Sequence, residues 1–280
     1  MTIDTHAHLN FNAYKNDLED VIERCRKEGI WVVNIGSQYD TSKRAVEIAE
    51  KYGSGFFAAI GLHPLHLQTG LVKIKEDIEE TQFLSREEKF DPEKYRKLAE
   101  SKKVVAIGEA GFDYYWKPKT KKKLEIFKQK QEEALSSQFI LAKELGLPVI
   151  LHCRMAHQDL ISFLEENGAI RPEKAIVHSF VGTNEQLEKY LSLGYQIGFN
   201  GIIFKTIQGI DFDNLIRSAP LEKIMAETDA PYLTPPPFAG KRNEPAFIKS
   251  TIEKIAGIKG IEAEEASDQF SKNAREFFGI

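Results

Sequence analysis

The segment PVILHCR, residues 148–154, contains the pattern on which the prediction of the fold depends. Val149, Ile150 and Leu151 are continuously apolar up to His152, instead of alternating with polar residues. Such a run is typical of a parallel strand that is covered on both faces. WVVNIG at 31–36 and VVAIG at 104–108 share this property. Parallel strands need long return connections, so helical segments should separate these runs.

The chain does alternate in this way. Eight short apolar runs can be assigned as strands, at residues 1–5, 31–36, 56–61, 104–108, 148–152, 175–178, 195–200 and 223–228. Between the first two, Leu18, Val21, Ile22 and Cys25 have the spacing of one helix face, and Gly29 follows as a cap. Further helices are predicted within 41–53, 120–145, 158–167, 184–192, 213–218, 246–255 and 263–278.

Eight strands with intervening helices predict a (β/α)8 TIM barrel that forms a single α/β domain over residues 1–280. An open doubly wound sheet has a similar local signature and is the alternative. Residues 68–103 form a long, highly charged insertion between the third and fourth strands, which we expect to fold as one or two surface helices.

Composition excludes several classes of protein. A hydrophobic content of 42% and a charged content of 29% are ordinary for a globular protein, and no apolar run is long enough to span a bilayer. No secretory signal is visible, and two cysteines predict free thiols in a reducing compartment, so we expect a cytoplasmic enzyme. A net charge of −4 argues against a protein that coats nucleic acid, but not against one that grasps a single phosphate.

Polar residues gather where the predicted strands end. His6 and His8 close the first strand and are spaced to share one face of it. The other strand ends contribute His63, Glu109, His152, His178 and Asp229. A barrel brings all these ends to one mouth. Each residue alone could be a hydrogen-bonded structural group or a helix cap, but six nitrogen and oxygen ligands around one mouth, leaving His63 aside, suit two divalent ions.

The sequence resembles the TatD family of metal-dependent deoxyribonucleases, within the amidohydrolase superfamily. The stretches that carry the resemblance are DTHAHLNF, GLHP, GEAGFDYYW, HCRMAH, VHSF, GFNG and ETDAPYLTPPPFAGKRNEP, which run from residue 4 to 245. The two histidines of the first stretch are shared across the superfamily, whereas the GEAGFDYYW and ETDAPYL stretches are more diagnostic.

The resemblance implies a ligand set and a mechanism. His6, His8, Glu109 and Asp229 would hold one ion, and Glu109, His152 and His178 the second, with Glu109 bridging. The ions, Mg²⁺, Mn²⁺ or Zn²⁺, would share and activate a water that attacks a phosphodiester. Asp229 would act as the general base. His63, Arg154 and Arg242 would contact the substrate, although His63 could instead cap its loop and either arginine could lie on the surface.

Neighbouring residues have weaker assignments. Tyr114, Tyr115 and Trp116 could stack on an unpaired base or pack against the barrel. Asp113 is expected to brace its loop or a ligand histidine instead of binding metal.

The predicted function is a deoxyribonuclease that prefers single strands and 3′ ends, with DNA as its substrate and with no membrane or obligate protein partner. One alternative is another amidohydrolase reaction, on an ester, lactone or amide, because one metal pair serves all of these reactions. A second alternative is a binding protein without turnover.

Overall fold

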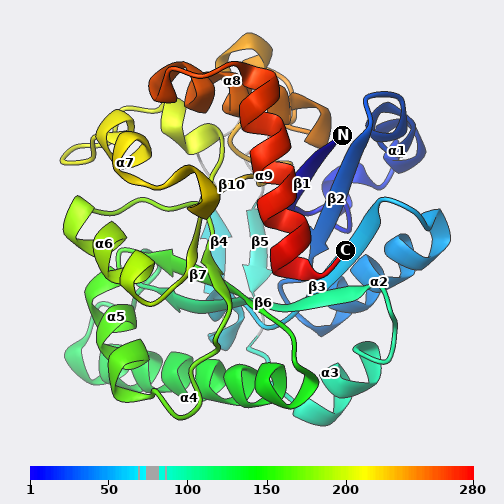
Figure 1. Ribbon diagram of the computed structural model, residues 1–280. Coiled ribbons are helices and arrows are strands. Elements are labelled where there is room, and N and C mark those ends of the chain that lie inside the picture. The colour runs from blue at the N-terminus through cyan, green and yellow to red at the C-terminus, as the bar shows by residue number, and fades with distance from the viewer. Residues whose placement is uncertain (69, 74–81, 86) are drawn as a thin grey trace.

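The predicted strands form a parallel sheet in the order β1-β2-β3-β6-β7-β8-β9-β10, with the first and last strands meeting to close a barrel (Figure 1). The computed structural model describes residues 1–68, 70–73, 82–85 and 87–280. It confirms the single-domain (β/α)8 barrel. The strands are β1 Thr2–Ala7, β2 Ile30–Ile35, β3 Phe56–Ile60, β6 Val104–Asp113, β7 Val149–Arg154, β8 Ala175–Val177, β9 Gln196–Phe199 and β10 Ile224–Ala226.

Helices follow the strands and cover the outside of the barrel. They are α1 Leu18–Lys27, α2 Tyr39–Tyr52, α3 Pro92–Leu98, α4 Lys121–Leu145, α5 His157–Glu166, α6 Asn184–Ser192, α7 Phe212–Ser218, α8 Ile248–Lys259 and α9 Ala263–Phe278. Short 3-10 turns occupy η1 Asn12–Tyr14, η2 Pro64–Leu67, η3 Gly201–Phe204, η4 Leu221–Lys223, η5 Pro236–Phe238 and η6 Pro245–Phe247.

The sequence patterns explain these helices. In α1 the predicted apolar positions Val21, Ile22 and Cys25 are the buried ones. The long helix α4 ends where predicted, because Gly146 adopts a left-handed conformation with φ of 65° that caps it.

The barrel is closed by few backbone contacts. Ala7 of β1 forms an isolated parallel bridge with Ala230, four residues beyond the end of β10. The His8 N–H donates to the Ala230 carbonyl at 2.7 Å, and the Asp229 N–H donates to the His6 carbonyl at 2.8 Å. The first strand and the segment after the last strand are therefore held side by side at one end of the barrel.

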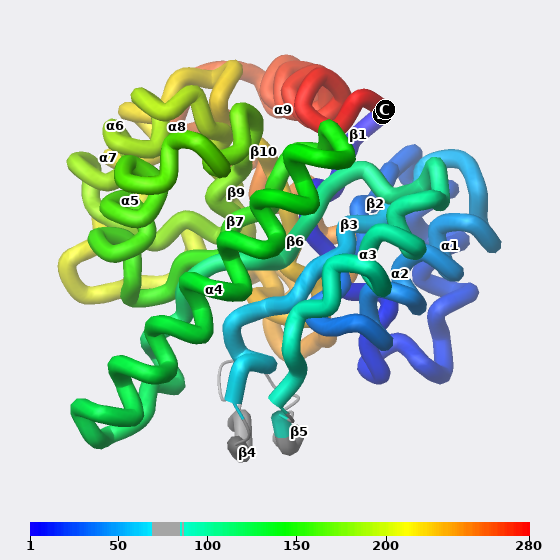
Figure 2. The backbone as a smooth tube through the Cα atoms, turned by 90° about the horizontal axis from the view of Figure 1, so that it is seen from below, coloured from blue at the N-terminus to red at the C-terminus, as the bar shows by residue number. Residues whose placement is uncertain are grey.

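The opposite end of the barrel is apolar. A cluster inside the barrel joins side chains of the strands with Phe277 and Phe278 of α9. Helix α9 lies across this end, at the front in Figure 1 and at the top in Figure 2. We call the inward-facing apolar residues Ile3, Ile150, Ile176 and Met225 the barrel floor. A second, larger cluster fills the layer between the strands and the outer helices.

Polar residues begin two positions beyond the floor. Ile150 and Ile176 are register partners in β7 and β8. Because residues i and i+2 of a strand share a face, His152 and His178 point into the barrel directly above them. The far end of the barrel, which we call the mouth, is thus lined by the predicted ligands.

The insertion differs in part from its prediction. The prediction of surface helices is right for α3, but β4 Gly70–Lys73 and β5 Gln82–Ser85 form an antiparallel pair where a helix was also expected. In Figure 1 this pair lies behind the barrel, away from α9. Residues 69, 74–81 and 86 of the insertion lie outside the described residues.

Two other expectations can be compared with the structure. No helix within the described part of the chain combines the length and apolarity that a bilayer crossing requires. Cys25 and Cys153 are both free and buried, and burial raises the pKa of each thiol, to about 12 for Cys25.

Candidate metal centre

The six predicted ligands meet at the mouth, although two strands run further than expected. Glu109 was predicted to end its strand, yet β6 continues to Asp113, and β7 continues past His152 to Arg154. The longer strands pair with each other up to their ends, where Asp113 is the register partner of Arg154. The side chains of Glu109 and His152 therefore lie on rigid sheet instead of on loops.

One group of donor atoms surrounds a single point. The Nε2 atoms of His6 and His8 lie 3.3 Å apart, and Glu109 Oε2 lies 3.5 Å and 4.0 Å from them. Asp229 Oδ1 lies 3.8 Å from His6 Nε2 and 3.4 Å from His8 Nε2. Two ligands of one zinc-like ion can be no more than about 4.2 Å apart, twice the bond length, so these spacings suit a shared cation.

A second group surrounds the other oxygen of the same carboxylate. Glu109 Oε1 lies 2.6 Å from His152 Nδ1 and 2.9 Å from His178 Nε2. The residues Glu109, His152 and His178 thus form a second cluster of possible ligands. Each oxygen of Glu109 faces its own set of imidazoles, which is the arrangement expected of a bridging ligand.

Irregular strand pairing aims two of these ligands. The β1–β2 register shifts between Asp4 and Ala7, and the β6–β7 register shifts between Ile107 and Ala110. His6 lies within the first irregularity and Glu109 within the second. Such irregularities redirect side chains and are frequent beside active sites.

Asp229 is held in an uncommon backbone conformation. Its φ of 59° is left-handed, which aspartate tolerates better than most residues. The Asp229 N–H donates to the His6 carbonyl, and the Asp229 carbonyl accepts from the Tyr232 N–H at 2.9 Å. These two bonds fix the conformation that turns the Asp229 carboxylate toward His6 and His8.

The partners of the histidines leave ligand nitrogens available. His8 Nδ1 lies 2.9 Å from the Ile35 carbonyl, so Nδ1 carries the proton there and the Nε2 lone pair faces the centre. His178 Nδ1 lies 3.2 Å from Glu227 Oε1, so its Nε2 faces Glu109 in the same way. A carboxylate behind a ligand histidine fixes its orientation and raises its basicity.

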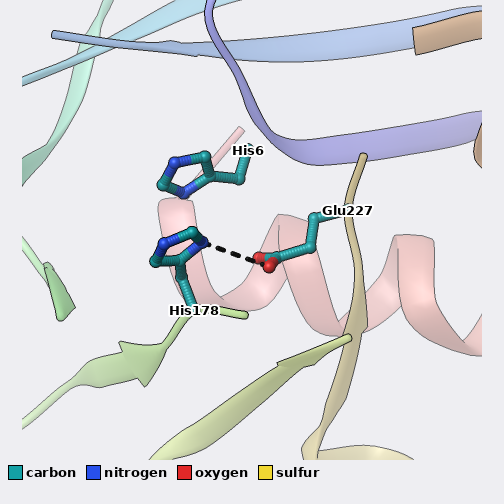
Figure 3. A group of neighbouring side chains, drawn as sticks. All are labelled: His6, His178 and Glu227. Carbon is teal, nitrogen blue, oxygen red and sulfur yellow. Dashed lines mark hydrogen bonds and ion pairs between the residues drawn. The ribbon is translucent and has the colours of Figure 1, made fainter. Parts of the chain in front are cut away.

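Glu227 is a site residue that the sequence analysis missed. Figure 3 shows it beside His178, whose ring stacks on that of His6 with centroids 3.7 Å apart. Its Oε1 also accepts from the Ser179 N–H at 2.6 Å and from the Asn200 amide at 3.2 Å. A Cβ at Gly198 would lie 2.4 Å from Glu227 Oε2, so only glycine leaves room for this carboxylate.

Asp4 is a second buried acid that was missed. Its Oδ1 accepts from the N–H groups of His6 and Thr228, and its Oδ2 accepts from the Thr228 hydroxyl at 2.6 Å. Asp4 thereby ties the start of the chain to the segment that carries Asp229. Burial raises the pKa of Asp4 to about 8, although these hydrogen bonds oppose the change.

The site strongly favours negative charge on its carboxylates. Burial disfavours charge on Glu109, but His178, His63 and His152 hold the pKa of Glu109 well below its usual range. Burial likewise opposes charge on Asp229, and the neighbouring histidines again lower its pKa. Glu109 and Glu227 raise the pKa of His178 well above normal in spite of its burial. These acids therefore create a place for positive charge.

The position of His63 is compatible with both roles proposed for it, a loop cap and a substrate contact. Its Nδ1 accepts from the Leu65 N–H at 2.9 Å and so caps η2, as the structural alternative required. The proton of the neutral ring must then lie on Nε2, which is 3.5 Å from Glu109 Oε1. Burial lowers the pKa of His63 to about 3, so the ring is a neutral donor that faces the centre.

Asp113 braces both a ligand histidine and its loop. Its Oδ2 lies 3.2 Å from His152 Nε2, and its Oδ1 accepts from the Tyr115 N–H at 2.8 Å. Of the three aromatic residues that follow, Tyr114 is buried, Trp116 is half-buried and Tyr115 is exposed.

The two arginines are in different situations. The guanidinium of Arg154 lies 3.8 Å from the centroid of the Tyr115 ring at the mouth. The guanidinium of Arg242 forms two hydrogen bonds with Asp17, at 2.9 Å and 2.6 Å, and lies over Tyr14. Contact between Arg242 and a phosphate stays a prediction, and it would have to compete with Asp17.

The donor set fits divalent cations. Imidazole nitrogens with carboxylate oxygens suit Zn²⁺ and Mn²⁺, and carboxylates also suit Mg²⁺. His6 Nδ1 and Glu227 Oε2 are buried and have no hydrogen-bond partner among the described residues. They belong to a further cluster, His6, His178 and Glu227 (Figure 3), which includes two of the predicted ligands.

Comparisons with known proteins identify relatives of this chain. Residues 3–279 match the family described as TatD related DNase. The chain is 36% identical to the metal-dependent hydrolase YabD of Bacillus subtilis, across the full length of both, and 33% identical to the 3'-5' ssDNA/RNA exonuclease TatD of Pantoea ananatis, across 99% of each. The crystal structure of YJJV, a TatD homolog from Escherichia coli, has a TM-score of 0.80 and 28% identity, covering 100% of this chain and 98% of that one.

Proposed function

Because this chain belongs to the TatD related DNase family of metal-dependent hydrolases, we propose that it cleaves phosphodiester bonds at the ends of single-stranded DNA. The observation that carries this proposal is the position of Glu109. Its two oxygens face two groups of donors, which supports binding of two ions, one by His6, His8, Glu109 and Asp229 and one by Glu109, His152 and His178.

When bound, the two ions would activate a water and stabilise the charge that develops on the phosphate oxygens. The residues of the chain supply the other functions. Asp229 lies 3.4 Å from His8 Nε2 and is kept ionised, so it can accept the proton of the attacking water. His63, held neutral with its Nε2–H toward the centre, can donate a hydrogen bond to a phosphate oxygen.

The preference for single-stranded ends has two supports. Relatives such as that of Pantoea ananatis are named as 3'-5' exonucleases of single-stranded DNA and RNA. In addition, His6 is fully buried and Glu109 is 4% exposed. A phosphodiester has to enter the barrel mouth to reach them, which is easier for a chain end than for the middle of a duplex.

The experiment uses a single-stranded oligonucleotide with a fluorophore at its 5′ end and a second batch labelled at its 3′ end. We expect cleavage with Mg²⁺, Mn²⁺ or Zn²⁺ and none with EDTA. Release of a labelled mononucleotide from the 3′-labelled batch alone would indicate attack from the 3′ end. Cleavage in EDTA, or turnover of simple esters or lactones without any turnover of oligonucleotides, would overturn the proposal.

A further inference from the structure

A strip of exposed basic and aromatic side chains leads from the mouth onto the start of α4. Residues 117–123, KPKTKKK, contain five lysines, and all five are exposed. Glu125 is the only acidic residue between 114 and 127. We call residues 115–123 together with Arg154 the basic strip.

The strip is attached directly to the metal centre. Asp113 accepts the N–H of Tyr115 with one oxygen and faces ligand His152 with the other. The Tyr114 N–H donates to the Arg154 carbonyl at 2.9 Å, which places Tyr115 beside Arg154. A single residue, Tyr114, therefore separates Asp113, which braces a predicted ligand, from the beginning of this surface.

Aromatic and apolar groups at the start of the strip are open to solvent. Tyr115 is 47% exposed, and Met155, which follows Arg154, is 68% exposed. The Tyr115 ring carries the Arg154 guanidinium on one face at 3.8 Å and meets Trp116 edge-on, with centroids 4.9 Å apart. Exposed aromatic rings next to arginine are the surface on which unpaired bases stack.

The lysines extend this surface away from the barrel. Helix α4 is fixed near the mouth by Gln131, whose amide exchanges hydrogen bonds with the Asp113 backbone. Lys121 lies ten residues earlier, about 15 Å along the helix axis. Figure 2 shows that this first part of α4 extends beyond the strands of the barrel at the end opposite α9.

Helix stability does not explain these lysines. The first turn of a helix favours acidic residues because of the helix dipole, yet α4 has none there and begins with Lys121, Lys122 and Lys123. Further along the helix, Lys128 pairs with Asp159 and Lys130 with Glu87. In contrast, none of the five lysines of the strip has an ion pair with any described residue.

We propose that the basic strip binds the single-stranded stretch adjoining the phosphodiester that is cut, with a base stacked at Tyr115 and the backbone phosphates along the lysines. The inference rests on the proposed function for its substrate. It adds the path that the strand follows outside the mouth, and it gives a protein whose net charge is −4 a local surface that attracts phosphates.

The test measures binding separately from cleavage. The metal-loaded protein is titrated onto a 5′-fluorescein phosphorothioate dT20, which resists hydrolysis, and fluorescence anisotropy is followed at several salt concentrations. For K121E/K122E/K123E we expect about 10- to 100-fold weaker binding at 0.1 M salt. The slope of log K against log salt should be shallower by about 2, because each lost phosphate contact contributes about 0.7.

Matched controls are available. K27E/K102E/K272E makes the same charge change at exposed lysines near the α9 end, and its binding should stay within twofold of that of the unaltered protein. Tyr115→Ala should weaken binding about tenfold or more, with Tyr115→Phe restoring it, because stacking needs the ring and not the hydroxyl. A dT20–dA20 duplex should bind less tightly than dT20. The same titration with rU20 compares the affinity for RNA with that for DNA.

Three outcomes would overturn the inference: unchanged affinity and salt slope in K121E/K122E/K123E, equal weakening in the two triple variants, or duplex binding as tight as that of dT20. The experiment measures binding of a strand that is not cleaved. Absence of nuclease activity would therefore contradict the proposed function, but it would not change the outcome for strand binding by the basic strip. Acidic residues at a helix start stabilise the helix, so K121E/K122E/K123E should remain folded. Its melting temperature checks this, because a lowered value would show that binding was lost through unfolding.

Discussion

The floor and the mouth of the barrel are built by the same strands and have opposite chemistry. Ile150, Ile176 and Met225 pack in the apolar floor, and two residues further along the same strands stand His152, His178 and Glu227. The floor side chains are at most 2% exposed and form one cluster with Phe277 and Phe278. Of the mouth side chains, His178 and Glu227 are almost equally buried and His152 is half-buried, but all three contact imidazoles or carboxylates.

Burial alone therefore does not distinguish the two layers. Apolar side chains stabilise the barrel when they are removed from water, whereas buried charges cost free energy unless partners compensate them. Substitution at the floor should therefore lower mainly the stability of the fold, and substitution at the mouth should lower mainly the activity. In barrel enzymes generally, the catalytic residues lie at the carboxyl ends of the strands.

The largest effect is expected at the mouth, for Glu109→Gln. The substitution removes the charge that both donor groups share, and the initial rate of oligonucleotide cleavage should fall by about 10³-fold or more. The melting temperature followed by circular dichroism should change by only a few degrees, because the floor is intact. Cleavage within tenfold of the unaltered protein would remove Glu109 from the mechanism.

The reverse result is expected at the floor, for Ile176→Ala. This side chain is 1% exposed, so its truncation should lower the free energy of unfolding by about 2–5 kcal/mol in a denaturant titration. The cleavage rate per folded molecule at 25 °C should stay within twofold. A large loss of rate in the folded variant would show that the layers are not independent.

A smaller effect is expected behind the mouth, for Glu227→Gln. Loss of the carboxylate behind His178 should weaken metal binding by about 10- to 100-fold, measured by competition with a chelating dye. Glu222→Gln, an exposed change five residues earlier, is the matched control and should leave the affinity unaltered. If both variants bind metal equally well, Glu227 has no positioning role.

The smallest effect concerns His157, a histidine buried outside the barrel interior. Its Nε2 faces the Val181 carbonyl and its Nδ1 the Tyr190 hydroxyl, and burial lowers its pKa to about 4. The folded-state pKa is below that of the unfolded chain, so unfolding takes up a proton in acid. The stability that neutral His157 confers is complete above about pH 6.5 and is lost as the pH falls toward about 4.

At pH 5.5 this loss should reach about 1 kcal/mol. His157→Gln should make the melting temperature depend less steeply on pH between 7.5 and 5.5. If the pH dependence of the melting temperature is unchanged in His157→Gln, folding does not lower the pKa of His157.

Much of this arrangement could be predicted from the sequence. The continuous apolar runs gave the strands, and spacing by two placed His152 and His178 above Ile150 and Ile176 because strand geometry is local. The prediction that Glu109 bridges two ions followed only from the family resemblance. The orientation of the Glu109 side chain depends on a register irregularity between β6 and β7, which cannot be predicted from a local sequence pattern.

The residues that were missed act over long separations. Glu227 lies two positions before Asp229, and the sequence alone does not separate the roles of these two acids. Its partner His178 is 49 positions away. Asp4 binds Thr228 across 224 positions. Arg242 was predicted as a substrate contact, but its bond to Asp17, 225 positions away, was not predicted. The β4–β5 pair was missed because the charged composition of the insertion also suits an exposed helix.

The closure of the barrel by Ala7 and Ala230 has a consequence for biosynthesis. His6 and His8 emerge from the ribosome first, but Asp229 and the contacts that hold it beside them exist only after four-fifths of the chain has been made. Since chains fold from the amino terminus as they are synthesised, a nascent chain lacks a complete ligand set until nearly its last fifth. A product whose translation stops before residue 229 would therefore lack the complete proposed metal centre, and with it the proposed hydrolase activity.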